Sequence, residues 1–352
     1  MSNRSIAVVA AGAAIVLMGP VAAAAQSSAP ASDGWVTPRT ADGHPDLQGI
    51  WASDSATPLQ RPEELADKAT LSDEEVATLQ ARAAELFNGE TDAAFGESIF
   101  RAALADRQDY QSGDGVTQEN PKGTGNYNQF WLIDRWFDNR TSLIVDPANG
   151  RMPPRTADGE RRAEEQRAAR AARADAAPRT LAEELSRLGS GLRCGGGRVP
   201  LTGRGYNSNY QIFQSANYVA IQMEMMHDTR LVPIAGQSSH PSAPRNALGN
   251  SRGHWDGDTL VVETTNLARG VSGSSRDVRL TERFTRVGPE TMQYEYTVDD
   301  PSTWTQPWTA RIYMRPAPGT GVIYEFACHE GNYAIEHTLR GARALEKTAE
   351  SQ

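Results

Sequence analysis

The sequence lacks an excess of positive charge and the common cofactor motifs. It also lacks any long apolar run beyond the one near its N-terminus. Its 44 acidic residues outnumber 35 basic ones, so the formal net charge is −9 and nucleic acid is a poor candidate partner. No apolar run after the N-terminus could cross a bilayer, so we expect no stable membrane insertion. No Walker loop, Rossmann fingerprint or His-Glu-x-x-His motif occurs in the chain. We therefore expect no redox cofactor, with a metal ion as the alternative.

Cysteine is also scarce, because the chain has only Cys194 and Cys328. The two are too far apart for a Cys-x-x-Cys redox motif. In an oxidising compartment, the expected state of such a pair is one structural disulfide. Two buried free thiols are the alternative. A nucleophilic Cys328 beside His329 is a third interpretation, but the export that the N-terminal residues predict (next paragraph) argues against it.

The N-terminus has the parts of a secretory signal peptide. Arg4 gives a basic start, Ile6 to Met18 is apolar or small, and Ala23 to Ala25 offers a cleavage site. Roughly 13 apolar residues are too few for a spanning helix, which needs about 20. We therefore expect residues 1–25 to be a cleaved signal peptide, residues 26–34 to be a flexible leader, and the protein to be periplasmic or secreted.

The rest of the chain is expected to form one β-rich domain over residues 35–344, followed by a disordered tail at 345–352. Ser72 and Glu75 form a capping box before a helical pattern, which predicts a helical insertion at about residues 72–88. A segment rich in Ala, Arg and Glu predicts further helix at about residues 160–189.

The C-terminal half has the period-2 alternation of antiparallel strands. Thr291 to Val298 alternates apolar and polar residues, as do the runs that contain Ala310 to Met314 and Val322 to Cys328. Asp256-Gly257 is a hairpin signal before another strand. The pattern predicts a mainly β fold, an antiparallel up-and-down sheet that closes toward a barrel, with peripheral helices from the N-terminal half.

Two resemblances follow from particular residues. The stretch from Trp255 to Val262 resembles strands of the calycin barrels, the lipocalins and fatty-acid-binding proteins. Several motifs spread over the chain resemble a widespread family of exported, uncharacterised bacterial proteins; they include Pro45 to Trp51, Glu224 to Arg230 and Cys328 to Tyr333. The calycin resemblance implies a pocket in the mouth of the barrel, whereas the exported family implies no mechanism.

Reactive side chains concentrate in two segments that each follow a predicted strand. The first is Glu224 to Arg230 and the second is His329 to Tyr333. If the two segments meet at one pocket, His227 and His329 can act as acid and base, because imidazoles titrate near neutral pH. The carboxylates of Glu224, Asp228 and Glu330 would then orient an imidazole or serve as a second catalytic group. This hypothesis predicts a hydrolase, lyase or isomerase.

Other residues of the two segments and the nearby strands are candidate substrate contacts. Arg230 would pair with an anionic group of the substrate. The remaining candidates are Tyr210, Gln222, Asn209 and Asn332. The alternative to an enzyme is a periplasmic protein that binds a small organic ligand in a barrel pocket without turning it over. The sequence leaves the oligomeric state and the identity of the ligand open.

Overall fold

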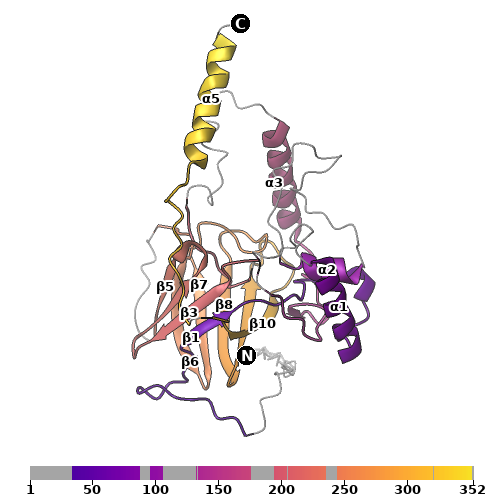
Figure 1. Ribbon diagram of the computed structural model, residues 1–352, viewed down its shortest axis with the longest axis vertical. Coiled ribbons are helices and arrows are strands. Elements are labelled where there is room, and N and C mark those ends of the chain that lie inside the picture. The colour runs from indigo at the N-terminus through magenta and orange to yellow at the C-terminus, as the bar shows by residue number, and fades with distance from the viewer. Residues whose placement is uncertain are drawn as a thin grey trace, which may run out of the picture.

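The computed structural model describes residues 34–87, 96–105, 132, 134–175, 194–203, 205–234, 244–319 and 321–350. The expected signal peptide and nearly all of the expected leader lie outside these residues. The described part of the chain is mainly β, with one ten-stranded antiparallel sheet. Helices pack beside this sheet or project from it (Figure 1).

The first half of the chain supplies the helices and two short strands. In chain order they are β1 (Gly49–Ala52), the 3-10 helix η1 (Glu63–Leu65), α1 (Asp73–Leu86), α2 (Ser98–Leu104), β2 (Ile144–Asp146) and α3 (Ala157–Asp175). The capping box predicted for α1 is present, because Ser72 and Glu75 each accept a hydrogen bond from the other's backbone N–H. Helices α1 and α2 form a small second core with Phe137.

The second half supplies the rest of the sheet. Its elements are β3 (Asn209–Gln214), β4 (Tyr218–Met223), the 3-10 helix η3 (Met225–His227), β5 (Thr229–Pro233), β6 (Asn250–Asp256), β7 (Thr259–Thr265), β8 (Arg279–Gly288), β9 (Thr291–Asp299), β10 (Trp308–Pro316) and the helix α5 (Ala334–Glu350). The predicted hairpin at Asp256-Gly257 joins β6 to β7. The alternation in β9 is also confirmed, since its inward residues Met292 to Val298 belong to the main core.

The strand order is β5-β4-β3-β1-β10-β9-β8-β7-β6, with β2 paired to β10. The sheet curls so that its edge strands β5 and β6 approach each other, but it is not closed. One isolated parallel bridge, between Ile234 and Gly253, joins the two edges. A Cβ atom at Gly253 would lie 2.6 Å from Ile234 Cδ1, so glycine at this position lets the two edges approach without a shift of the isoleucine side chain.

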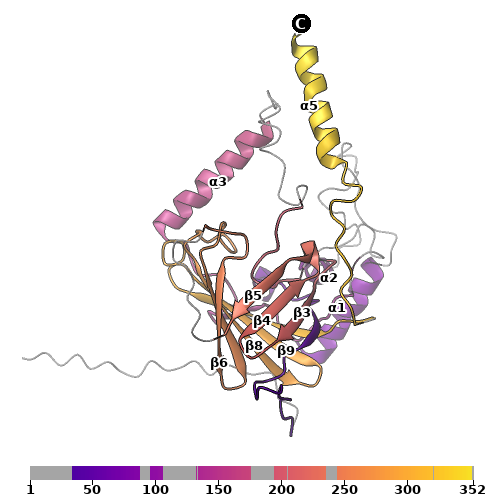
Figure 2. The same cartoon turned by 90° about the vertical axis from the view of Figure 1, so that its left-hand side faces the viewer.

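Two expectations for the C-terminal region are wrong. Residues 322–328 form no strand, although their pattern alternates. The reason is that β10 already pairs with β9 on one side and with β1 and β2 on the other, which leaves it no free edge. Residues 345–350 of the expected disordered tail are helical, because α5 continues to Glu350. Both α3 and α5 project from one end of the sheet (Figure 2).

Candidate functional site

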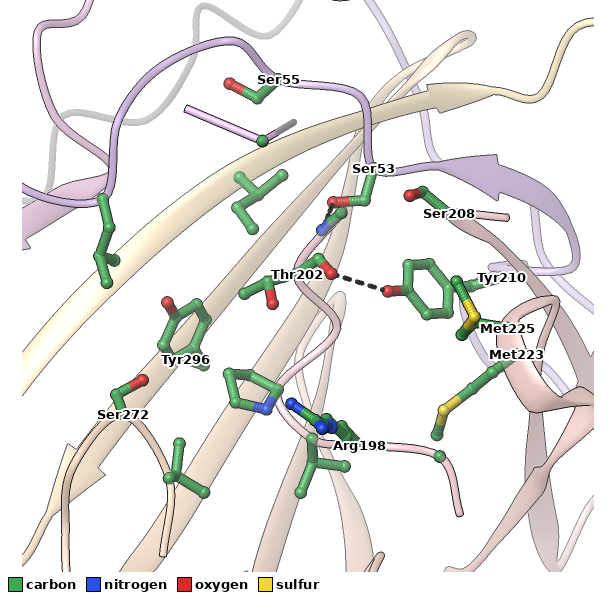
Figure 3. Close-up of a pocket in the computed structure, with 18 of the residues that line it drawn as sticks. Ser53, Ser55, Arg198, Thr202, Ser208, Tyr210, Met223, Met225, Ser272 and Tyr296 are labelled. Carbon is green, nitrogen blue, oxygen red and sulfur yellow. Dashed lines mark hydrogen bonds between the residues drawn. The ribbon is translucent and has the colours of Figure 1, made fainter. Parts of the chain in front are cut away.

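A cavity of about 470 Å³ lies at the end of the sheet where β4 and β7 end and where β3 and β10 begin. Its walls come from parts of the chain that are distant in sequence. They include Ser53 after β1, Tyr210 on β3, Met223 on β4 and Tyr296 on β9. Figure 3 shows these side chains around one hollow. This volume is typical of a site for one small organic molecule.

One wall of the cavity is the segment of residues 194–203, which we call the cavity strap. Hydrogen bonds hold it from several sides. The N–H of Gly197 donates to the Asp228 carboxylate, the N–H of Leu201 donates to the Tyr294 hydroxyl (2.9 Å), and the N–H of Gly203 donates to Ser53 Oγ (3.0 Å). The Tyr210 hydroxyl also donates to the Thr202 carbonyl (3.3 Å), as Figure 3 shows.

The first residue of the cavity strap is covalently fixed. Cys194 forms a disulfide with Cys328, with 5.7 Å between the two Cα atoms. This confirms the disulfide predicted from the sequence. The bond brings the C-terminal segment to the strap, which is in turn hydrogen-bonded to Asp228 after β4. The two reactive segments of the sequence are therefore connected through the strap, although no hydrogen bond or ring contact joins His227 to His329.

Backbone strain concentrates at the cavity. Six described residues other than glycine have a positive φ, a conformation that costs roughly 1–2 kcal/mol for an L-residue. Three of them line the cavity: Asn207, Met226 and Ser272. Two more, Cys194 and His227, are chain neighbours of lining residues. Such strain persists where the surrounding structure enforces it, and it is common at binding sites.

Tyr296 puts a hydroxyl group into the cavity from its buried side. The residue is only 1% exposed, and its ring packs edge-on against Trp308 with 5.9 Å between the centroids. Its hydroxyl has no hydrogen-bond partner within the described part of the chain, and Figure 3 shows it directed at the hollow. Burial raises the pKa of Tyr296 well above its ordinary value, so the phenol stays protonated and can donate a hydrogen bond.

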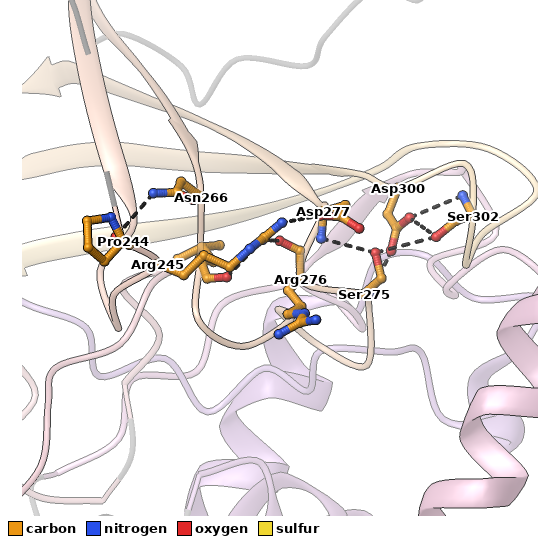
Figure 4. A network of polar contacts seen from close by, with 9 residues as sticks. Pro244, Arg245, Asn266, Ser275, Arg276, Asp277, Asp300 and Ser302 are labelled. Carbon is orange, nitrogen blue, oxygen red and sulfur yellow. Dashed lines mark hydrogen bonds and ion pairs between the residues drawn. The ribbon is translucent and has the colours of Figure 1, made fainter. Parts of the chain in front are cut away.

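The rim of the cavity is formed in part by the loop of residues 270–277, which carries Ser272. Asp300 fixes this loop, because its carboxylate accepts a hydrogen bond from the N–H of Ser275 (2.6 Å) and from Thr303 Oγ1 (2.6 Å). Figure 4 shows Asp300 at one end of a polar network that also contains Arg245. The side chain of Arg245 binds the Arg276 carbonyl and the Asp277 carboxylate.

The pKa of Asp300 lies below its ordinary value. Burial by itself acts to raise it, but the hydrogen bonds donated by Thr303, Ser302 and Ser275 favour the charged carboxylate and outweigh that effect. The ionised side chain is thus the form that holds the rim loop.

The first predicted catalytic segment does not continue the strand. The strand β4 ends at Met223 and the chain turns through η3, with Met226 and His227 both at positive φ. The turn places the His227 ring against Gln222, with 2.7 Å between the two Nε2 atoms. Since the neighbours of Gln222 on β4 point into the core, Gln222 and the imidazole lie on the outer face of the sheet. Neither residue lines the cavity.

Glu224 and Asp228 both hold backbone groups. The Glu224 carboxylate accepts a hydrogen bond from the N–H of Asn209 (3.1 Å), and burial raises its pKa. Asp228 accepts from Gly197 on the cavity strap. Among the predicted substrate contacts, Tyr210 lines the cavity, whereas Asn209 lies beside Glu224 and outside the cavity lining.

The second predicted segment is near the disulfide. His329 and Glu330 are exposed, and Asn332 donates a hydrogen bond to Cys194 Sγ (3.5 Å). None of the three lines the cavity. A catalytic role for His227 and His329 therefore stays a prediction, and the structure joins their segments without placing either imidazole in the hollow. In the described ranges, no group of three or more His, Cys, Asp or Glu side chains could hold a metal ion.

Arg230 lies inside the sheet rather than at a surface that a substrate could reach. It is 2% exposed and forms an ion pair with Glu282, which is fully buried (2.5 Å). It also donates to Ser251 Oγ (2.8 Å) and Thr264 Oγ1 (2.6 Å), and so connects β5 to β6, β7 and β8. The other oxygen of Glu282 accepts from Tyr294, whose hydroxyl in turn accepts from the cavity strap.

Several lining residues belong to no pattern that could have been recognised from the sequence. Tyr296 is one member of the regular alternation of β9, and Ser272 is in a loop without a recognised motif. Comparison of the chain with models of protein families, with curated proteins and with solved structures found no match. No helix in the described ranges is long and apolar enough to cross a membrane. The function must therefore be inferred from the geometry of the cavity.

Proposed function

We propose that this protein binds a small organic molecule in the cavity beside the cavity strap. The observation that carries the proposal is the Tyr296 hydroxyl, which makes no hydrogen bond in the described structure and belongs to a residue that lines a hollow of about 470 Å³. A hydrogen bond from this hydroxyl to a ligand would contribute about 0.5–1.5 kcal/mol net.

Two further features support a binding role. Five of the six described residues other than glycine with a positive φ line the cavity or adjoin a lining residue. Five separate links hold the strap that forms one of its walls. A preformed wall lowers the entropy cost of binding, because little of it must be ordered when the ligand enters. A cavity at the open end of a curled antiparallel sheet is also where the calycin barrels place their ligands.

We further propose that binding takes place in the periplasm or outside the cell. The disulfide between Cys194 and Cys328 supports this location, because such bonds persist in oxidising compartments. The N-terminal pattern that suggests export lies outside the described residues.

A screen of chemically diverse fragments by ligand-observed NMR tests the binding proposal. Fragments that bind the native protein should lose at least about tenfold in affinity in Met225→Trp, because the larger side chain takes up space in the cavity. The matched control is Phe213→Trp, which also introduces an indole but places it on the outer face of β3, where Phe213 is 46% exposed. The proposal fails if no fragment binds, or if the bound fragments keep their affinity in Met225→Trp.

Substitution of the two histidines distinguishes a binding protein from an enzyme. A binder should keep its ligand affinity and form no product in both His227→Gln and His329→Gln. A hydrolase or lyase that uses the two rings should turn over its substrate and lose that turnover in each variant while it stays folded.

A further inference from the structure

Three methionines reach the cavity from one tight turn of the chain. Met223, Met225 and Met226 all belong to the cavity lining and occur within four consecutive residues. The turn is closed by a hydrogen bond from the N–H of Met223 to the Asp228 carbonyl (2.9 Å). Figure 3 shows Met223 and Met225 on the same side of the cavity strap as Tyr210. Three thioether groups thus come from one short segment.

These methionines differ from those in the core. Met292 and Met314 are at most 1% exposed and are enclosed by the main core. Met225 and Met226 are only half-buried. The two side chains at the cavity are therefore open to a solute that enters it.

Met223 is the fixed member of the group. It is 2% exposed, and its Sδ lies 2.8 Å from the point that a Cβ atom of residue 197 would occupy. Asp228 Oδ2 lies 3.1 Å from the same point, so the carboxylate and the sulfur are close neighbours. The carboxylate is held there by the N–H of Gly197. Its negative charge favours a cation beside the sulfur.

Thioether sulfur is a soft and uncharged metal ligand. It selects soft ions such as Cu(I) over Mg²⁺ or Ca²⁺, which prefer oxygen ligands. It has no proton to lose and forms no disulfide, so it remains a ligand in an oxidising compartment. The unbranched methionine side chain has three rotatable bonds, which lets the sulfur atoms of Met225 and Met226 turn toward Met223 Sδ.

From these observations we propose that the turn after β4 binds one Cu(I) ion through the sulfur atoms of Met223, Met225 and Met226. Met223 is the preset ligand, and the other two side chains close on the ion as it binds. The Asp228 carboxylate balances the charge of the ion without being a ligand. This site needs no organic molecule, so the inference goes beyond the proposed function.

NMR of the full chain with ¹³C-methyl-labelled methionine locates the ion directly. The probe is Ag(I) in chloride-free buffer, because Ag(I) is a diamagnetic and air-stable substitute for Cu(I). The three cavity signals should shift and saturate at one equivalent of Ag(I), whereas the signals of the other described methionines should stay in place; these are Met152, Met292 and Met314. Zn²⁺ should shift none of them, because it prefers nitrogen, oxygen and thiolate ligands.

Variants test the ligands with Cu(I) itself, in competition with the chelator bicinchoninate in the absence of oxygen. Loss of a group that only supports a metal ligand costs about 10–100-fold in affinity, so Met225→Leu and Met226→Leu should each cost at least about tenfold. Leucine nearly preserves the volume, which keeps both variants folded. The matched control is Met152→Leu, a half-buried methionine outside the cavity lining, which should leave the affinity unchanged.

Several results would overturn the metal site. They are the absence of any shift with Ag(I), an equal shift of the Met152 signal, an equal response to Zn²⁺, and full Cu(I) affinity in both cavity variants. If the site fails in this way while fragments bind in the cavity, the proposed function stands. If no fragment binds but Ag(I) shifts the three cavity signals, the metal site stands and the proposed function fails.

Discussion

The carboxylate of Asp228 accepts a hydrogen bond from the backbone N–H of Gly197, across 31 residues of sequence. The contact ties the turn after β4 to the cavity strap. Glycine at residue 197 favours this close approach, since a Cβ atom there would lie 2.8 Å from Met223 Sδ and the methionine side chain would have to move. Asp228 thereby shapes a cavity that its own side chain does not line.

Removing this carboxylate should loosen the cavity strap. In Asp228→Ala, hydrogen exchange at Gly197 should become faster, and the free energy of unfolding should fall by about 1.5–3 kcal/mol, the usual value of a hydrogen bond to a charged group. The control is Asp258→Ala, which removes an exposed ion pair with Arg39 and should cost less than about 1 kcal/mol. Unchanged exchange at Gly197 would show that the contact does not hold the strap.

Gly203→Ala should displace the other end of the strap. A Cβ atom at residue 203 would lie 1.7 Å from the Ser53 carbonyl oxygen, so the backbone must move away. We expect a loss of about 2–4 kcal/mol in chemical denaturation, together with weaker ligand binding. Gly341→Ala is the control, because it lies in α5 with nothing within 4 Å. It should leave the protein unchanged or slightly more stable.

The buried pair of Arg230 and Glu282 predicts a non-additive double-mutant cycle. Arg230→Met leaves the Glu282 carboxylate buried without its cation, which should cost about 3–5 kcal/mol. The double variant Arg230→Met/Glu282→Leu removes both charges and should recover most of that loss. Equilibrium unfolding of the native protein, the two single variants and the double variant measures the coupling. Simple addition of the two single losses would contradict an interacting pair.

The lowered pKa of Asp300 predicts loss of stability in acid. The carboxylate is held in its charged form in the folded protein, so its contribution is complete above the ordinary Asp pKa of 3.8. That contribution disappears as the pH falls through the lower pKa of the folded state. Asp300→Asn should therefore lose less stability than the native protein between about pH 4 and pH 2. Thr303→Val removes one of the donors and should give an intermediate dependence. If the free energy of unfolding falls equally with pH in all three proteins, the Asp300 carboxylate does not stabilise the fold in its charged form.

The disulfide should contribute strongly to stability, because it closes a long loop. The two cysteines are 134 residues apart, and the chain-entropy model gives about 4–5 kcal/mol for a loop of that length. Reduction should lower the denaturation midpoint of the native protein. The variant Cys194→Ser/Cys328→Ser should match the reduced protein and should not respond to reductant. A native protein that is equally stable with and without reductant would argue against this contribution.

The sequence alone determined the features that depend on near neighbours. The capping box of Ser72 and Glu75, the hairpin at Asp256-Gly257 and the alternation of β9 all follow from local geometry with a fixed period. The disulfide was also predictable, because two cysteines allow only one pairing within the chain.

Only the tertiary structure decided which residues face the cavity. Residues 322–328 form no strand although their pattern alternates, because β10 has no free edge with which they could pair. The turn through Met226 and His227 places the His227 imidazole on the outer face of the sheet rather than in the predicted pocket. The cavity itself joins Ser53, Met223 and Tyr296, which lie in distant parts of the sequence. Periodicity in a sequence specifies which side of a strand is buried, but the strand order and the path of the strap decide what each buried side chain meets.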